Sequence, residues 1–171
     1  MHIVLKLFFA VLAVATVNGC GARTGPNETP RSPAGFVTVV GDATSTEVLK
    51  QLKSNGIRTS SSLEDQGDSS LIIVVQDSTV GPMPVHLEIA KSLDKRPHAE
   101  YLWIFTNTSM VDDQELLELE ELECREIFNS QGLPGNDISF AFDSAGARVA
   151  AGYQCPKGWD EINRHVRSIV R

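Results

Sequence analysis

The sequence feature that most constrains the fold is an uninterrupted apolar run at residues 71–75, LIIVV. Mostly β-branched residues without polar alternation are typical of a strand covered on both faces, as in the middle of a parallel sheet. Similar short runs recur along the chain, and the segments between them have the apolar spacing of amphipathic helices. Strands that alternate with helices predict a three-layer α/β fold, with a mostly parallel sheet and right-handed crossovers.

The expected elements follow one another along the second part of the chain. Strands are predicted at residues 36–41, 71–76, 101–106 and 138–143, with a further edge strand at residues 57–62. Helices are predicted within residues 42–56, 85–95, 109–128 and 158–170. Residues 147–154 fit either a short extra strand or a loop.

The first nineteen residues have the pattern of an export signal. Lys6 precedes an uncharged run at residues 7–17, which is shorter than the ~20 residues that a membrane crossing needs. Residues 17–20, Val-Asn-Gly-Cys, resemble the lipobox of bacterial lipoproteins, in which the signal is cut before a cysteine that receives lipid. Cys20 is therefore the predicted lipidation site. The alternative is an ordinary signal peptide with a chance cysteine, which would make the protein secreted.

A tether is predicted between this cysteine and the folded domain. Residues 21–35 contain no apolar residue larger than Ala or Pro and are rich in Gly, Pro, Ser and Thr, so they cannot bury enough surface to fold. The sequence thus predicts a signal peptide at residues 1–19, a flexible tether at 20–35 and one α/β domain at 36–171. By resemblance to bacterial lipoproteins, Gly21 favours an anchor in the outer membrane of the cell envelope.

Charge excludes one class of partner. The chain has 15 basic and 22 acidic residues, and loss of Lys6 with the signal leaves a balance of −8. Nucleic-acid binding needs clustered Lys and Arg, so nucleic acid is not an expected partner. His86, His98 and His165 lack the spacing of a zinc site, and neither a metal nor another cofactor is predicted.

Two cysteines remain once Cys20 is assigned to lipid. Cys124 falls within the predicted helix at residues 109–128, and Cys155 precedes the last helix. In an oxidising periplasm they could form a disulfide, and two buried thiols are the alternative. Their spacing in the sequence does not test the geometry that a bridge requires.

The segment at residues 109–128, SMVDDQELLELEELECREIF, predicts an acid-rich amphipathic helix that Asp112 or Asp113 caps. At about 100° per residue, its apolar face is expected to comprise Leu116, Leu117, Cys124, Ile127 and Phe128, with Leu119 at the margin. Most of the acids then face solvent, which favours a solvated surface over a metal or catalytic site. Glu120 is the exception, because it projects into the apolar side.

Three segments, in order, carry a resemblance to a known family. They are residues 71–84, LIIVVQDSTVGPMP; residues 104–128, IFTNTSMVDDQELLELEELECREIF; and residues 132–147, GLPGNDISFAFDSAGA. Together they resemble the GTP-binding domain of bacterial elongation factor Tu over roughly residues 71–147. The resemblance implies a truncated domain of the P-loop NTPase class, in which the acid-rich helix follows the guanine-reading loop.

The departures from that family concern the groups that bind and hydrolyse GTP. The family requires a glycine-rich loop ending in Gly-Lys-Thr, whose amides and lysine hold the phosphates. Here residues 41–48 read GDATSTEV, with Gly41 but without a second glycine or a lysine. Residues 57–70 contain neither the family's Asp-Cys-Pro-Gly-His motif nor any histidine. The resemblance therefore implies a pseudo-GTPase without enzyme activity.

Guanine reading is degenerate as well. In the family's Asn-Lys-x-Asp motif the Asp accepts hydrogen bonds from the base, whereas this chain retains Asn107 and has Ser109 where the Asp would fall. Any residual nucleotide contact would involve Asn107, Ser144 and Ala145. Three functions stay open: a membrane-anchored lipoprotein that binds an unidentified protein partner, which we expect; a protein with residual guanine-nucleotide binding; and a structural envelope lipoprotein.

Overall fold

The computed structural model describes residues 35–93, 100–149 and 154–171. The predicted signal peptide, with Cys20 and all of the tether except Gly35, lies outside the described residues. The strands are β1 (Phe36–Gly41), β2 (Thr59–Ser60), β3 (Ser69–Asp77), β4 (Glu100–Thr106) and β5 (Ser139–Phe142). The helices are α1 (Ser45–Ser54), α2 (Pro84–Ser92), α3 (Gln114–Ser130) and α4 (Trp159–Ile169), with short 3-10 turns η1 (Leu63–Asp68), η2 (Thr108–Met110) and η3 (Gly135–Asp137).

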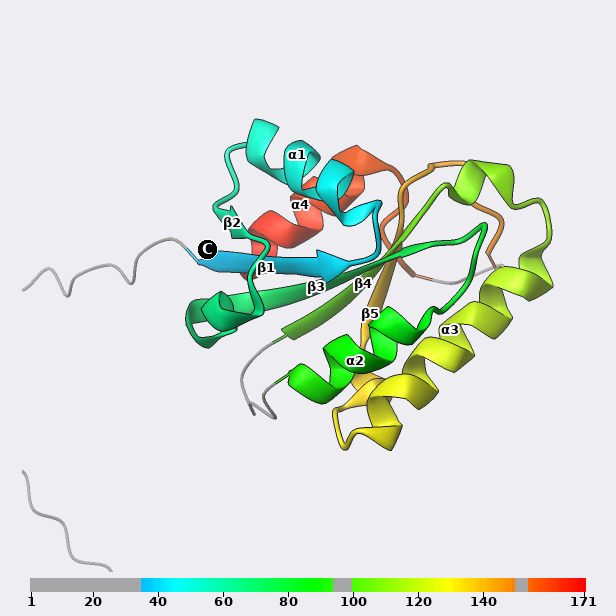
Figure 1. The fold of residues 1–171 in the computed structure, drawn as a ribbon. Helices are drawn as coiled ribbons and strands as arrows, with labels where there is room; N and C mark the ends of the chain where they lie inside the picture. Colours follow the sequence, from blue (N-terminus) through cyan, green and yellow to red (C-terminus); the bar gives the residue numbers. More distant parts are fainter. Residues whose placement is uncertain (1–34, 94–99, 150–153) are drawn as a thin grey trace, which may run out of the picture. The chain divides into compact units, whose positions relative to one another are not determined.

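The described strands form one parallel sheet in the order β2-β1-β3-β4-β5. Helices α1 and α4 cover one face of the sheet, and α2 and α3 cover the other (Figure 1). The predicted three-layer α/β fold is thus confirmed, and every described strand pair is parallel.

The buried run at residues 71–75 supplies both halves of the core. Ile72 and Val74 pack with the residues of α2 and α3. Leu71, Ile73 and Val75 pack with those of α1 and α4. Because side chains alternate between the faces of a strand, a strand that is covered on both faces must be apolar at every position. This explains why the sequence shows no alternation there.

The edge of the sheet at β2 differs from its prediction. Instead of a strand over residues 57–62, β2 is limited to Thr59 and Ser60, which lie opposite Val37 and Thr38 of β1. A short 3-10 helix, η1, leads from β2 to β3. The segment left open at residues 147–154 contains no strand within its described residues, 147–149 and 154, and residues 150–153 lie outside the described part.

Helix α3 begins at the predicted residues. Its buried face, however, is rotated about the helix axis from the face that the sequence predicts. Asp113 caps it, because its side chain accepts a hydrogen bond from the amide of Glu115 at 2.9 Å. Leu117, Cys124 and Phe128 are fully buried, and Glu121 is buried on one flank. Leu116 was expected in the apolar face, but it is 41% exposed. The expectation was wrong because the flank that carries Glu121, rather than the flank that carries Leu116, packs against the rest of the domain.

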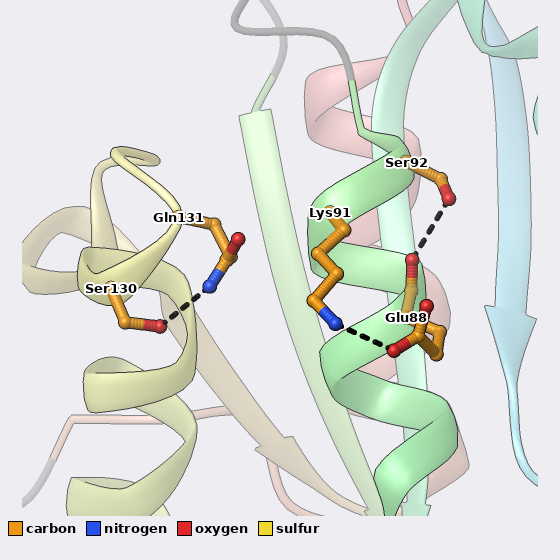
Figure 2. A network of polar contacts seen from close by, with 5 residues as sticks. All are labelled: Glu88, Lys91, Ser92, Ser130 and Gln131. Carbon is orange, nitrogen blue, oxygen red and sulfur yellow. Dashed lines mark hydrogen bonds and ion pairs between the residues drawn. The ribbon is translucent and has the colours of Figure 1, made fainter.

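Helix α2 ends at Ser92, whereas the prediction extended to residue 95. Side-chain contacts within the helix lie near this end. Pro84 starts the helix, where a missing amide hydrogen costs nothing. Near its end, Lys91 lies 2.7 Å from Glu88, and the Ser92 hydroxyl donates to the Glu88 carbonyl oxygen at 2.8 Å (Figure 2).

None of the helices within the described residues is both long and apolar enough to cross a membrane.

Candidate functional site

The sheet has a topological switch point between β1 and β3. From β1 the chain runs through α1 to β2 at the edge of the sheet, and it then returns to β3 and continues through β4 to β5. In open parallel sheets the crevice at such a point, outside the carboxyl ends of the strands, is where ligands bind. The carboxyl edge near β1 and β3 is therefore the first place to look for a site.

Polar side chains follow four strands at this edge. Asp42 comes directly after β1, Asp77 ends β3, Asn107 follows β4 and Asp143 follows β5. Parallel strands end at the same edge, so these residues lie side by side although they are far apart in the sequence.

Asp42 connects the end of β1 to β3. Its Oδ1 accepts hydrogen bonds from the amide of Thr44 at 2.9 Å and from the Thr44 hydroxyl at 2.5 Å. Its Oδ2 accepts from the amide of Asp77 at 2.6 Å. The Thr106 hydroxyl of β4 lies 2.9 Å from Thr44 Oγ1 and 3.1 Å from the Gln76 carbonyl oxygen. Both carboxylate oxygens of Asp42 are thus used within the protein.

Asp77 connects β3 to the loop after β4. Its Oδ2 accepts from Asn107 Nδ2 at 2.8 Å, and its Oδ1 accepts from the amide and the hydroxyl of Thr79 at 2.8 and 2.7 Å. Burial by itself would raise the pKa of Asp77, but the hydrogen bonds from Thr79 and Asn107 together outweigh it and lower that pKa. Asp77 is therefore a carboxylate at neutral pH.

Asp143 joins the loop after β4 to the loop after β5. Its Oδ2 accepts from the amide of Asn107 at 2.9 Å, and its Oδ1 accepts from the amide and the hydroxyl of Thr108 at 3.1 and 2.6 Å. The amide of Ser144 donates to Thr108 Oγ1 at 3.2 Å. Asn107 has φ of 58° and ψ of 22°, a left-handed conformation that Asn tolerates better than most residues.

The structure thus brings together two of the three residues predicted for residual nucleotide contact. Asn107 and Ser144 both lie around Asp143, and Ala145 follows in the same turn, against Gly158. The Asn107 amide group is already bonded to Asp77. Sequence reasoning missed Asp42, Asp77 and Asp143. The signal that could have found them is their position, since each stands at the end of an apolar run.

The connection from β1 to α1 has no room for a phosphate cradle. Gly41 has φ of 152°, and a Cβ added to it would lie 2.2 Å from the Val75 carbonyl oxygen, so β1 and β3 are in close backbone contact there. Three residues, Asp42 to Thr44, separate β1 from α1. Phosphate loops are longer, rich in glycine and supplied with a lysine. Lys50, the first lysine of α1, instead lies 3.6 Å from Glu47 on the exposed side of the helix.

A hollow of about 490 Å³ adjoins Gly41, beside the turn η1. Its walls comprise Val39, Val40, Ser45, Ser61, Ser62, Leu63, Glu64, Val85 and Ile89. No Lys or Arg is among these residues, and Glu64 adds a negative charge. The hollow therefore does not favour a phosphate group either.

A buried polar cluster lies between β3 and α3. Gln76 Nε2 donates to Glu120 Oε2 at 3.1 Å, and the Cys124 thiol donates to Gln76 Oε1 at 3.2 Å. On the neighbouring helix α2, His86 Nδ1 accepts from the Met83 amide at 2.9 Å, so Nε2 carries the proton that is donated to the Val75 carbonyl oxygen at 2.9 Å. The prediction that Glu120 faces the apolar side is confirmed, since its side chain is 3% exposed.

The environment changes the acidity of this cluster. Burial raises the pKa of Glu120 to about 7, helped by the negative charges of Glu123 and Asp77 and opposed by the Gln76 amide. Burial, reinforced by the charge of Glu120, also raises the pKa of the Cys124 thiol, which therefore stays protonated. A buried, protonated thiol is a poor nucleophile.

Cys124 and Cys155 are free thiols in the structure. Cys124 is buried against the sheet, whereas Cys155 is half-buried, and burial raises the pKa of its thiol to about 11. The disulfide between them stays a prediction.

Within the described residues, no group of three or more His, Cys, Asp and Glu side chains is arranged to hold a metal ion. His86 is used by the backbone of β3, and His98 lies outside the described residues.

No protein-family model matches the chain.

Proposed function

We propose that the chain is a lipid-anchored protein of the bacterial cell envelope whose α/β domain binds another protein and does not hydrolyse GTP. One observation carries the non-enzymatic part. At the carboxyl edge of the sheet, the carboxylates of Asp42, Asp77 and Asp143 accept hydrogen bonds from neighbouring amides and hydroxyls, so they are engaged by the protein's own donors. An edge that holds three carboxylates, and whose hydrogen-bond network among the described residues includes no Lys or Arg side chain, repels a nucleotide phosphate.

The finer fold proposal is a degenerate GTP-binding domain of the elongation factor Tu type. The residue resemblance over roughly residues 71–147 supports it. So does the meeting of Asn107 and Ser144 at one edge, since the resemblance places Asn107 in the guanine-reading loop and Ser144 in the Ser-Ala turn. In this proposal the fold has been kept, while the phosphate loop and the switch residues have been lost.

Calorimetry with GDP and Mg²⁺ tests the loss of nucleotide binding. The purified protein is expected to give no saturable heat, and authentic elongation factor Tu serves as the positive control. Saturable binding with a Kd below about 10 µM would contradict the proposal, because such an affinity needs ~7 kcal/mol of contacts. It would instead support the alternative of residual guanine-nucleotide binding.

A specific observation favours that alternative as the second candidate. Asn107 and Ser144 lie around the same carboxylate, Asp143, and Ala145 follows Ser144 in the chain, although Asn107 Nδ2 is bonded to Asp77. If GDP binds, an Asn107→Ala variant should weaken binding. A structural lipoprotein without a ligand is the third candidate, and affinity capture from the producing cells separates it from a partner-binding protein.

A further inference from the structure

Helix α3 carries apolar side chains on the side that faces away from the sheet. Leu116, Leu119 and Leu122 are 41%, 52% and 63% exposed. They follow one another at intervals of three residues, so they form a stripe along the helix. Single exposed leucines are ordinary on protein surfaces, whereas several on one helix face are characteristic of an interaction site. We call Leu116, Leu119 and Leu122 the leucine stripe.

Exposed acids flank the leucine stripe. Glu115, Glu118, Glu123 and Glu126 all lie on the exposed part of α3. Within the described residues none of these four makes an ion pair, and Glu118 accepts a hydrogen bond from Gln114 at 2.6 Å. On α2, by contrast, Glu88 is paired with Lys91 (Figure 2).

The one basic residue of α3 does not neutralise these acids. Arg125 donates from Nη1 to the carbonyl oxygens of Gly135 and Asn136, each at 3.0 Å, and its guanidinium lies over the Phe140 ring at 4.6 Å. It is held on the side of the helix that faces η3 and β5. The exposed side of α3 therefore combines an apolar stripe with flanking negative charges.

Charge complementarity selects the occupant of this surface. A second copy of the chain would place acids against acids, and an anionic membrane surface would repel them. A basic amphipathic helix fits instead, because its apolar residues cover the leucines while its Lys and Arg side chains pair with the flanking glutamates. We propose that the leucine stripe of α3 is the docking surface for such a helix in a protein partner. This inference rests on the proposed protein-binding function.

The leucine stripe can be substituted without disturbing the residues that hold α3 to the sheet. Leu117, Cys124 and Phe128 are fully buried and hold the helix to the sheet. Substitutions at Leu119 and Leu122 on the other side leave these contacts in place. Met110 offers a matched control, because it is apolar and 73% exposed but belongs to the turn η2 rather than to α3.

A fluorescein-labelled helical peptide of about 17 residues, matched to the length of α3, serves as the probe. It carries leucines at the i, i+3, i+4, i+7 positions and lysines elsewhere. Fluorescence anisotropy with the purified protein should show binding that weakens as salt is added. Leu119→Gln/Leu122→Gln should weaken binding by at least about tenfold, since these two are the most exposed leucines of the stripe. Glu115→Gln/Glu118→Gln should also weaken it and reduce its salt dependence, and Met110→Gln should match the wild type.

The proposal is overturned if the Leu119→Gln/Leu122→Gln variant binds the peptide as tightly as the wild type, or if a peptide with Glu in place of Lys binds equally well. Association of the protein with itself or with anionic vesicles through the same leucines would overturn it too. Circular dichroism checks that each variant is folded, and Leu119→Ala/Leu122→Ala gives the same test without a polar group if the Gln variant unfolds. A partner captured equally by the wild type and the leucine variant would refute this surface while leaving the proposed function intact.

Discussion

Glu120 is the residue whose chemistry departs most from its surroundings. Its carboxyl group is enclosed between α3 and β3, where Gln76 donates to it, and the charges of Asp77 and Glu123 act on it. The helical pattern alone predicted that Glu120 faces the apolar side, because its position depends only on its spacing from Leu117 and Cys124. The same pattern did not show what it would meet there, since Gln76 lies 44 residues away in the sequence.

The raised pKa of Glu120 predicts a pH-dependent stability. The folded protein holds this proton up to a pH of about 7, whereas an unfolded glutamate loses it near 4.5. The free energy of unfolding should therefore fall as the pH rises from about 4.5 to about 7, by an amount on the order of 3 kcal/mol. Urea denaturation at several pH values measures this, and Glu120→Gln should remove most of the decline.

Exposed Glu118→Gln is the control for that measurement, because it removes a carboxylate from the same helix without touching the buried cluster. It should leave the decline unchanged. A Glu120→Gln variant whose stability still falls as the wild type's does would show that another group is responsible.

Among the secondary-structure elements, α3 shows how far periodicity reaches. The start of the helix, its acid-rich exposed side and its main buried residues agree with the sequence pattern. The exposure of Leu116 disagrees with the pattern, which placed this residue in the buried face. A helical wheel gives the angle between residues, but it does not give the rotation of the whole helix against its sheet. That rotation depends on the packing of Leu117, Cys124 and Phe128 against β3, β4 and α2.

The N-terminus of α3 gives a prediction at this scale. Asp113→Ala removes the acceptor for the Glu115 amide and the negative charge at the start of the helix. The free energy of unfolding should fall by about 1 kcal/mol. Urea denaturation measures it, with Asp112→Ala as the control, because the side chain of Asp112 does not cap the helix. Equal losses in the two variants would mean that general charge, rather than capping, stabilises this end.

At the scale of the whole molecule, the predicted lipid anchor, Cys20, lies outside the described residues. If Cys20 carries lipid, Cys20→Ser should abolish incorporation of radiolabelled palmitate and move the protein from the membrane fraction to the soluble fraction. Cys155→Ser is the matched control and should keep the label. Labelling that persists in Cys20→Ser would refute the lipoprotein prediction.

The hydrogen-bond network at the carboxyl edge of the sheet also depends on the whole fold. Asp42 follows β1, Asp77 ends β3 and Asp143 follows β5, and each becomes part of the network only when its strand is placed beside the others. The resemblance predicted Asn107 and Ser144 as possible contacts to a base. It could not predict that Asn107 would bond to Asp77, or that Asn107 and Ser144 would both lie around Asp143, because these contacts depend on the strand order.

The sequence alone was enough to predict the alternation of strands and helices, the central position of the strand at residues 71–76 and the lack of a phosphate loop after the first strand. These follow from local causes: side-chain alternation, apolar spacing and the identity of the residues after Gly41. The rotation of α3, the shortness of β2 and the hydrogen bonds of the three carboxylates became visible only in the folded domain. Each of these depends on which distant segments pack together, and that depends on the combined burial of side chains from the whole domain.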